Sequence, residues 1–214
     1  MFNICPGCGQ YNEEKIVKDG AIAVCPACHY EHHFVSLPLM VVTGSSGSGK
    51  STVALQLATR LTSVVCIESD VLWRDEFNTP ENDYKEYRSL WLRVAKNIGQ
   101  AGRPVVLFGS AAVGQFEQCI ESRYFSSIEY LALVCDEAEL VARLKRRPSW
   151  RNTGSDEMLK IFVGFNRSLI ENANQTTPPM QLLDTTALTL EESCERTAQW
   201  IEQVVSRSKN ACKS

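Results

Sequence analysis

A glycine-rich segment of eight residues constrains the fold of this chain more than any other feature. Residues 44–51 read GSSGSGKS and satisfy the pattern GxxxxGK[ST] at every fixed position. An apolar run, LMVVT, precedes the segment, and a helix-like run, STVALQLATRL, follows it. A simple Gly/Ser-rich turn is the alternative, but a chance match rarely has the correct strand and helix on its two sides. The segment therefore predicts a phosphate-binding loop at a strand-to-helix junction.

The chemistry of such a loop comes from its backbone and from two side chains. Its glycines allow the backbone to bend so that successive N–H groups point at phosphate oxygens, and the helix N-terminus adds its positive dipole end. We expect Lys50 to reach the β- and γ-phosphates of ATP and the Ser51 hydroxyl to bind Mg²⁺. The predicted nucleotide-binding residues of the loop are Gly44, Ser45, Gly47, Ser48, Gly49, Lys50, Ser51 and Thr52.

Short apolar runs alternate with longer helix-like segments from residue 37 onward. The expected strands are at 39–43, 64–68, 104–109, 128–135 and 181–183. The expected helices are at 50–61, 83–100, 115–124, 137–147, 156–172 and 190–206. This alternation is typical of βαβ units around a parallel sheet, and the almost continuously apolar strands fit a sheet with helices on both faces. The sequence therefore predicts an α/β domain over residues 37–214.

The first 36 residues differ from the rest because they contain four cysteines in two pairs. Cys5 with Cys8, and Cys25 with Cys28, each form a CPxC motif, and sixteen residues separate the two motifs. This spacing is typical of zinc ribbons, in which two tight turns supply four thiolates to one tetrahedral ion. A redox CxxC pair is the alternative, but it explains one pair and not two. We expect residues 1–36 to form a zinc ribbon with a structural Zn²⁺, since four ligands leave no open position.

The remaining histidines and cysteines are not expected to bind metal. With four thiolates available, His29, His32 and His33 are predicted to lie outside the ligand set. The other cysteines are scattered in mostly apolar segments and are interpreted as packing residues; they are Cys66, Cys119, Cys135, Cys194 and Cys212. The N-terminus MFNICPGCGQ lacks the features of a secretory signal, and no apolar run approaches the ~20 residues that span a bilayer. These features predict a reducing, cytoplasmic location.

A phosphoryl-transfer enzyme also needs a group that orients the attacking hydroxyl or holds Mg²⁺. Asp70 follows the second apolar run, at the carboxyl end of a strand, where ligands bind in open α/β sheets. We expect this catalytic residue to accept the proton of the acceptor hydroxyl or to bind Mg²⁺ through water. Two alternatives are that Asp70 caps the following helix, and that Glu68 has the functional role instead.

A basic segment, RLKRRPSWR at 143–151, has five cations in nine residues, and its proline is expected to end a helix. Such a segment can fold over the triphosphate, exclude water and stabilise charge in the transition state. We therefore expect a lid around 147–155, with Arg147 and Arg151 as catalytic residues and Arg143 as a nucleotide-binding residue. The alternative is a solvated helix end whose cations complement the helix dipole. Asn166 and Arg167 are further candidates on the helix that returns from the lid.

The acceptor side is predicted from the third strand and from a group of aromatic residues. The third strand ends in Gly109 and Ser110, where many P-loop ATPases carry an aspartate that holds Mg²⁺ through water. This difference favours a kinase-like arrangement over a motor or switch ATPase. Aromatic residues with an arginine suit a planar or sugar-bearing substrate, although aromatics at helical spacing are also typical of a core. The residues expected to line an acceptor pocket are Trp73, Arg74, Tyr84, Tyr87, Arg88 and Trp91.

Residues 38–207 resemble the nucleoside/nucleotide kinase-like group of P-loop proteins through GSSGSGKST, the strand-end ESD and the segment RLKRRPSWR. The layout, a zinc ribbon followed by a kinase-like domain, resembles bacterial proteins that are usually described only as AAA-family ATPases or nucleoside kinases. The resemblance implies a parallel sheet of five strands in the order 2-3-1-4-5, a lid, and phosphoryl transfer from ATP. It also implies functional roles for Lys50, Ser51, Asp70, Arg147 and Arg151.

The net charge of −3, from 22 basic and 25 acidic residues, argues against a protein that coats nucleic acid or anionic membranes. The leading hypothesis is an ATP-dependent kinase that phosphorylates a nucleoside, a nucleotide or a similar metabolite. The second is a nucleic-acid-directed end kinase or sensor that uses the zinc ribbon, although residues 1–36 carry only Lys15 and Lys18 as fixed cations. The third is a regulatory ATP-binding protein or ATPase whose ribbon contacts a partner.

Overall fold

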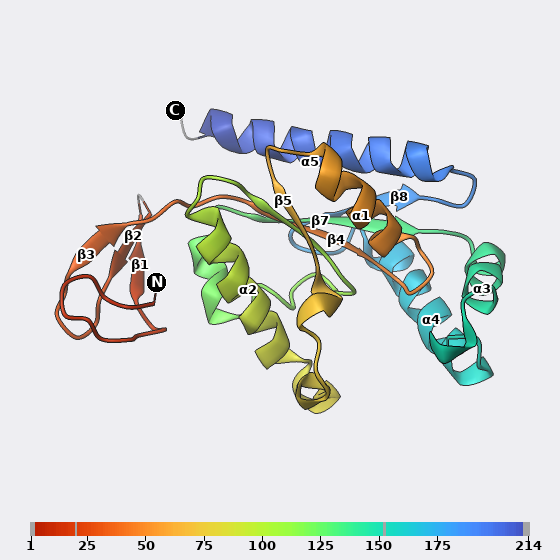
Figure 1. Ribbon diagram of the computed structural model, residues 1–214, viewed down its shortest axis with the longest axis horizontal. Helices are drawn as coiled ribbons and strands as arrows, with labels where there is room; N and C mark the ends of the chain where they lie inside the picture. The colour runs from red at the N-terminus through yellow and green to blue at the C-terminus, as the bar shows by residue number, and fades with distance from the viewer. Residues whose placement is uncertain (1–2, 20, 152, 212–214) are drawn as a thin grey trace.

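The computed structural model describes residues 3–19, 21–151 and 153–211, which form two sheets (Figure 1). The smaller sheet is antiparallel and contains β1 (Ile16–Lys18), β2 (Ile22–Val24) and β3 (Glu31–His33). The larger sheet is parallel and contains β4 (Leu39–Gly44), β5 (Val65–Glu68), β6 (Val105–Phe108), β7 (Ile128–Val134) and β8 (Met180–Asp184). The predicted boundary between residues 36 and 37 lies in the segment that links β3 to β4.

The strand order of the larger sheet is β5-β6-β4-β7-β8. Counted along its own five strands, this order is 2-3-1-4-5, so the predicted α/β fold and strand order are confirmed. The α-helices are α1 (Lys50–Arg60), α2 (Lys85–Gly99), α3 (Glu137–Lys145), α4 (Asp156–Asn172) and α5 (Leu190–Ala211). None of the helices in the described part of the chain combines the length and the apolar character that a bilayer crossing requires.

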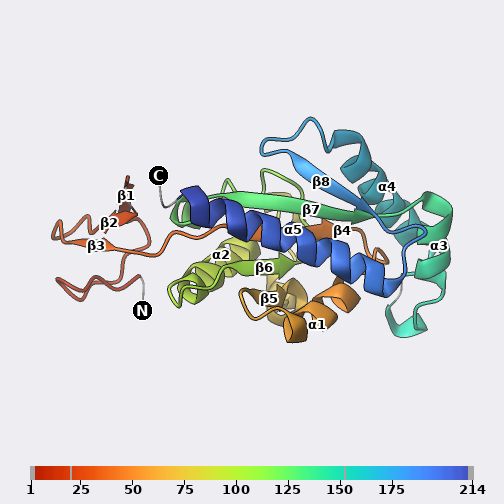
Figure 2. The same cartoon turned by 90° about the horizontal axis from the view of Figure 1, so that it is seen from above.

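The core consists of two layers, because successive side chains of a strand point to opposite faces. Leu39 and Val41 of β4 pack with residues of α2 and α4, whereas Met40 and Val42 pack with residues of α1 and α5. All four side chains are fully buried, as expected for a central strand that is covered on both faces. Figure 2 shows α5 running across the second of these faces.

Three short 3₁₀ helices connect β5 to α2, namely η1 (Ser69–Leu72), η2 (Asp75–Phe77) and η3 (Pro80–Asn82). A further 3₁₀ helix, η5 (Ser149–Arg151), follows α3 in the basic segment. Pro148 was expected to end the preceding helix, and α3 ends shortly before it, at Lys145.

The helix predicted at 115–124 is wrong. Residues 113–118 form turns, and they are followed by the 3₁₀ helix η4 (Ile120–Tyr124). Gly114 has a φ of 94° and Cys119 is extended, so the backbone is not helical at either position. The segment is nevertheless packed inward, since Glu121 and Tyr124 of η4 are buried.

Candidate functional site

The glycine-rich loop connects β4 to α1, where the sequence predicted it. A Cβ atom added to Gly44 would lie 2.5 Å from the carbonyl oxygen of Leu133, so the loop can approach β7 this closely only with glycine here. Gly49 has a φ of 99° and directly precedes α1, which has no acidic residue in its first turn. The start of α1 therefore presents backbone N–H groups and a positive dipole end toward the loop.

A polar cavity of about 250 Å³ opens next to this loop. Many of the predicted site residues line it, namely Gly47, Gly49, Lys50, Ser51, Thr52, Asp70, Arg143, Arg147 and Arg151. Gly44, Ser45 and Ser48 are not among the lining residues; the Ser45 hydroxyl is buried and donates to the carbonyl oxygen of Phe162 at 2.7 Å. Glu68, the alternative to Asp70, also lines it, together with Ser46, Phe108, Gly109 and Ser110, which were not predicted to bind the nucleotide.

Lys50 is held over the phosphate loop. Its Nζ donates to the carbonyl oxygens of Gly44 at 2.7 Å and Ser45 at 2.9 Å. Burial lowers the pKa of Lys50 to about 8, the charge of Asp70 opposes this shift, and the charge of Arg147 adds to it. Because bound phosphates would favour the charged ammonium, the position of Lys50 fits a role in binding an anion.

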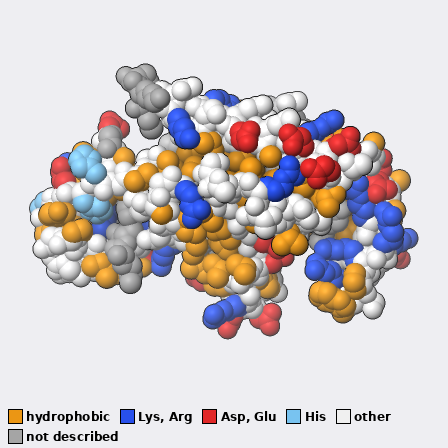
Figure 3. All heavy atoms as spheres, turned by 45° about the horizontal axis from the view of Figure 1, so that its top comes forward, with side chains coloured by type: hydrophobic (Ala, Val, Ile, Leu, Met, Phe, Trp, Pro, Cys, Tyr) orange, Lys and Arg blue, Asp and Glu red, His pale blue; other side chains and the backbone are white. Residues whose placement is uncertain are grey.

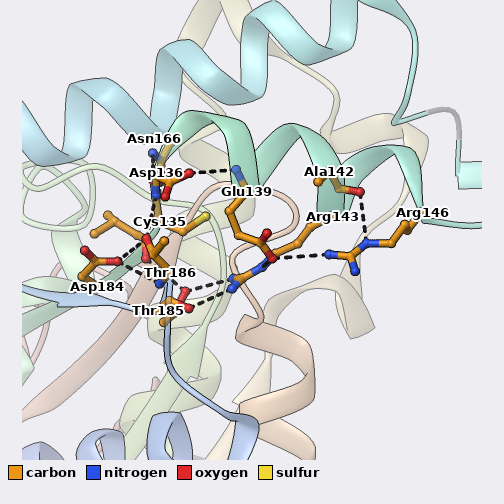
Figure 4. A network of polar contacts seen from close by, with 11 residues as sticks. Cys135, Asp136, Glu139, Ala142, Arg143, Arg146, Asn166, Asp184, Thr185 and Thr186 are labelled. Carbon is orange, nitrogen blue, oxygen red and sulfur yellow. Dashed lines mark hydrogen bonds and ion pairs between the residues drawn. The ribbon is translucent and has the colours of Figure 1, made fainter.

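The arginines of the basic segment divide between the cavity and the surface. Arg143 is fixed by Glu139 of its own helix and by Thr185, to which it donates from Nη1 to Oγ1 at 3.0 Å and from Nη2 to the carbonyl oxygen at 2.8 Å (Figure 4). Arg147 reaches the phosphate loop itself, and its Nη1 lies 3.2 Å from Ser46 Oγ. Arg146 instead turns back along α3 (Figure 4). Figure 3 shows Lys and Arg side chains gathered at this end of the molecule.

Asp70 is the second residue of η1 and its side chain is exposed. The alternative role as a helix cap is not seen, because Glu68 occupies the N-cap position of η1. The carbonyl oxygen of the adjacent Ser69 accepts a hydrogen bond from the Tyr87 hydroxyl, which ties η1 to α2. This position places Asp70 in the wall of the polar cavity and also in the wall of a second cavity.

The second cavity, here called the aromatic cavity, has a volume of about 280 Å³, and five of its fourteen lining residues are aromatic. Among the predicted acceptor residues, Trp73, Tyr84, Tyr87, Arg88 and Trp91 line it, whereas Arg74 is not among the lining residues. The remaining lining residues are Val41, Ser69, Asp70, Asn78, Leu107, Gly109, Ser110, Ala111 and Phe116. Asp70, Gly109 and Ser110 are shared with the polar cavity, so the two cavities meet at these residues.

Arg88 is the buried cation of the aromatic cavity. Its side chain is 9% exposed, and its Nη1 lies 3.2 Å from Asp83 Oδ2. Asp83 is itself held by Gln115, whose Nε2 donates to both carboxylate oxygens at 2.8 and 3.0 Å. Burial lowers the pKa of Arg88, while Asp83 opposes that shift. A guanidinium has five N–H donors, so this arginine can bind a further acceptor in the cavity.

Close packing explains why a glycine, Gly109, directly follows β6. A Cβ atom at Gly109 would lie 2.3 Å from Ser69 Oγ and 2.8 Å from Ser69 Cβ. An aspartate therefore does not fit at this position unless η1 moves. Close packing of η1 against the end of β6 instead brings Asp70 to the place where the cavities meet.

Asn166 and Arg167 lie outside both cavities. Asn166 is buried and hydrogen-bonds to the backbone of Cys135, donating to its carbonyl oxygen at 2.8 Å (Figure 4). Arg167 is exposed and forms an ion pair with Glu137 at 2.8 Å. Both residues therefore join α4 to the region around α3.

Two residues named in the sequence predictions lie outside the described residues. They are Asn152, within the predicted lid at 147–155, and Cys212, among the predicted packing cysteines.

The four N-terminal cysteines converge at a separate site. Their sulfur atoms all lie within 4.8 Å of one another, with 3.6 Å between Cys5 and Cys28 and 3.9 Å between Cys8 and Cys25. Zinc–sulfur bonds of about 2.3 Å in a tetrahedron require sulfur atoms about 3.8 Å apart. The four thiols thus fit a tetrahedral Zn²⁺. No histidine belongs to this cluster among the described residues.

Comparison with known proteins agrees with the observed architecture. Residues 40–159 match a family model described as an AAA domain. A sugar kinase from Janibacter sp. HTCC2649 is similar in structure, with a TM-score of 0.58 and 19% identity over 78% of this chain and 95% of that chain. A gluconokinase from Sinorhizobium meliloti 1021 is similar with a TM-score of 0.53 and 21% identity over 82% of this chain and 97% of that chain. At these identities the likeness shows the fold, and no curated protein sequence matches the chain.

Proposed function

The chain belongs to the AAA domain family whose model it matches, and from this premise we propose that it transfers the γ-phosphoryl group of ATP to a hydroxyl group of a small molecule. The observation that carries this proposal is the junction of the two cavities at Asp70, Gly109 and Ser110. A polar cavity beside a phosphate loop suits a triphosphate, and an aromatic cavity suits a ring-bearing acceptor. Two substrates bound there would meet beside a carboxylate.

In the polar cavity the protein binds and neutralises phosphate oxygens. Lys50 and the loop N–H groups bind the β- and γ-phosphates, and the Ser51 hydroxyl is the protein ligand available to Mg²⁺. When bound, Mg²⁺ would offset the negative charge of the phosphates. Arg147 and Arg151 line the same cavity and stabilise the charge on the transferring group. Arg143 supports this edge of the cavity from its fixed position against Thr185.

In the aromatic cavity the protein orients the acceptor. Rings of Trp73, Tyr87 and Trp91 offer apolar faces, and Arg88 offers hydrogen-bond donors to polar or anionic groups. Asp70 accepts the proton of the attacking hydroxyl, or orients that hydroxyl, as the phosphoryl group leaves ADP. An acceptor with a ring, a hydroxyl group and polar substituents fits this cavity, as a nucleoside, a nucleotide or a similar metabolite does.

A function directed at nucleic acid has less support from the N-terminal segment. Lys15 is fully buried, and Lys18 forms an ion pair with Glu31 at 2.6 Å. Lys15 and Lys18 therefore offer little to the phosphate backbone of a nucleic acid, which proteins bind mainly through exposed Lys and Arg. We propose instead that Cys5, Cys8, Cys25 and Cys28 bind one structural Zn²⁺, which stabilises the N-terminal segment and does not serve nucleic-acid binding.

The test is ATP consumption by the purified protein with Mg²⁺ against nucleosides, nucleoside monophosphates, sugars and short oligonucleotides. We expect ADP formation that depends on one class of small hydroxyl-bearing acceptor and that disappears in Lys50→Met. ADP formation that ignores every acceptor would overturn the kinase proposal in favour of a regulatory ATPase. ADP formation that depends on oligonucleotides would favour the nucleic-acid-directed alternative.

A further inference from the structure

The N-terminal segment contacts the rest of the chain through a buried polar network. Lys96 of α2 and Glu121 of η4 form an ion pair, and Lys96 Nζ also donates to Asn3 Oδ1 at 2.6 Å. The exposed fractions of these three residues are 2%, 0% and 4%, so the network is closed to water. Burying charges is costly unless they are paired in one defined geometry. The network therefore favours one defined position of the N-terminal segment relative to α2 and η4.

Further contacts surround this network. Arg93 of α2 forms an ion pair with Glu13 at 2.7 Å, and Arg123 of η4 donates to the carbonyl oxygen of Glu13 at 2.7 Å. The ring of Phe34 packs edge-on against Tyr124 of η4 with 5.3 Å between centroids. These residues join the N-terminal segment to both α2 and η4 with apolar as well as polar contacts.

The two elements that receive these contacts also build the aromatic cavity. Tyr87, Arg88 and Trp91 line the cavity, and they lie on α2, the helix that carries Arg93 and Lys96. Phe116 lines the same cavity from the segment that leads into η4. Figure 1 shows α2 extending from the side of the N-terminal sheet toward the 3₁₀ helices that follow β5. A displacement of α2 at the end that contacts the N-terminal segment would therefore also move Tyr87, Arg88 and Trp91 in the cavity wall.

We propose that the N-terminal ribbon acts within its own chain as a brace that holds α2 and η4 in the arrangement that forms the aromatic cavity. Lys96 and Glu121 are then positioning residues that act through α2, and the polar cavity does not depend on them. The consequence for acceptor binding rests on the proposed function, but the brace itself can be tested without any acceptor.

The test uses hydrogen exchange of the full chain with substitutions confined to the ribbon side. Asn3→Ala with Glu13→Ala removes the two contacts that these side chains make with Lys96 and Arg93 of α2, and also their contacts with Tyr11 inside the ribbon. It leaves the Lys96–Glu121 pair intact, and Phe34→Ala is a second, independent variant. Lys18→Ala is the matched control, because its partner Glu31 lies within the ribbon. We expect exchange of amides 86–92 to become at least tenfold faster in both variants, with the control unchanged. We also expect the dissociation constant for ADP, measured by calorimetry, to change less than twofold.

Three outcomes would overturn the brace. Faster exchange limited to residues 16–33 would show that the ribbon is an independent module. Unchanged exchange in residues 16–33 and in residues 86–92 would show that the substituted contacts do not hold α2 in place. Equal loosening of 86–92 and of the phosphate loop, with loss of ADP binding, would indicate general destabilisation. None of these results depends on whether the protein transfers a phosphoryl group, so failure of the brace and failure of the proposed function remain separable.

Discussion

Arg147 Nη1 donates a hydrogen bond to Ser46 Oγ at 3.2 Å and so joins the basic segment after α3 to the phosphate loop. The adjacent Arg146 points elsewhere, since it pairs with Glu139 at 3.3 Å and its side chain is 70% exposed. Two consecutive arginines therefore have different surroundings. This difference allows the role of the cavity-facing cation to be separated from a general effect of positive charge.

Arg147→Ala is expected to lower kcat by about 10²-fold, because a preorganised cation would be lost from the transferring phosphoryl group. Arg146→Ala removes the same charge outside the cavity and is expected to leave kcat within about twofold of the parent, since exposed ion pairs contribute little. Steady-state kinetics with the acceptor identified by the substrate panel provides the measurement. Equal losses in the two variants would contradict a specific role for Arg147.

Asp70→Asn is expected to lower kcat by about 10²–10⁴-fold, because the amide cannot accept the proton of the attacking hydroxyl. The substitution keeps the shape of the side chain, so the midpoint of thermal unfolding should hardly change. Asp75→Asn, at an exposed position in η2, is the matched control and should keep full activity. A variant at position 70 that unfolds more easily but turns over normally would show a structural role instead.

Arg88→Lys is expected to raise the KM for the acceptor by about tenfold and to leave the KM for ATP unchanged. Lysine keeps the charge beside Asp83 but loses the planar fork of donors that a guanidinium presents. Lys85→Met changes an exposed cation on the same helix and serves as the control. The kinetic constants for both substrates decide the question; a rise in the KM for ATP would place Arg88 on the nucleotide side.

The fold was predictable to a large extent because its signals are local. The apolar residues of β4 and the glycine-rich loop are contiguous in sequence, and they place a buried central strand before a helix. The predicted helix at 115–124 failed for a local reason as well. The composition of this segment does not reveal that Cys119, in its middle, has an extended backbone.

Most of the residues that line the two cavities were predictable segment by segment, but the way in which the segments meet was not. Lys50 and Ser51 come from a single motif, whereas the aromatic cavity brings together η1, α2 and the segment after β6. Phe116 could not be assigned to this cavity because the contact depends on how distant segments pack. The failure at Arg74 has the same origin, since proximity in sequence to Trp73 does not determine where a side chain points.

Cys25→Ser is expected to remove the Zn²⁺ that we propose for the N-terminal site and to lower the midpoint of thermal unfolding. The four sulfur atoms match a tetrahedral thiolate site, and structural zinc has an apparent binding free energy of ~10–16 kcal/mol in small domains. Cys66→Ser, in β5 and outside the cluster, is the matched control and should retain one zinc per chain. Metal content by mass spectrometry of the purified variants gives the answer. Equal zinc in the parent and in Cys25→Ser would contradict the site, whereas loss of zinc with unchanged ADP binding would show that the metal stabilises the ribbon and leaves the phosphate loop intact.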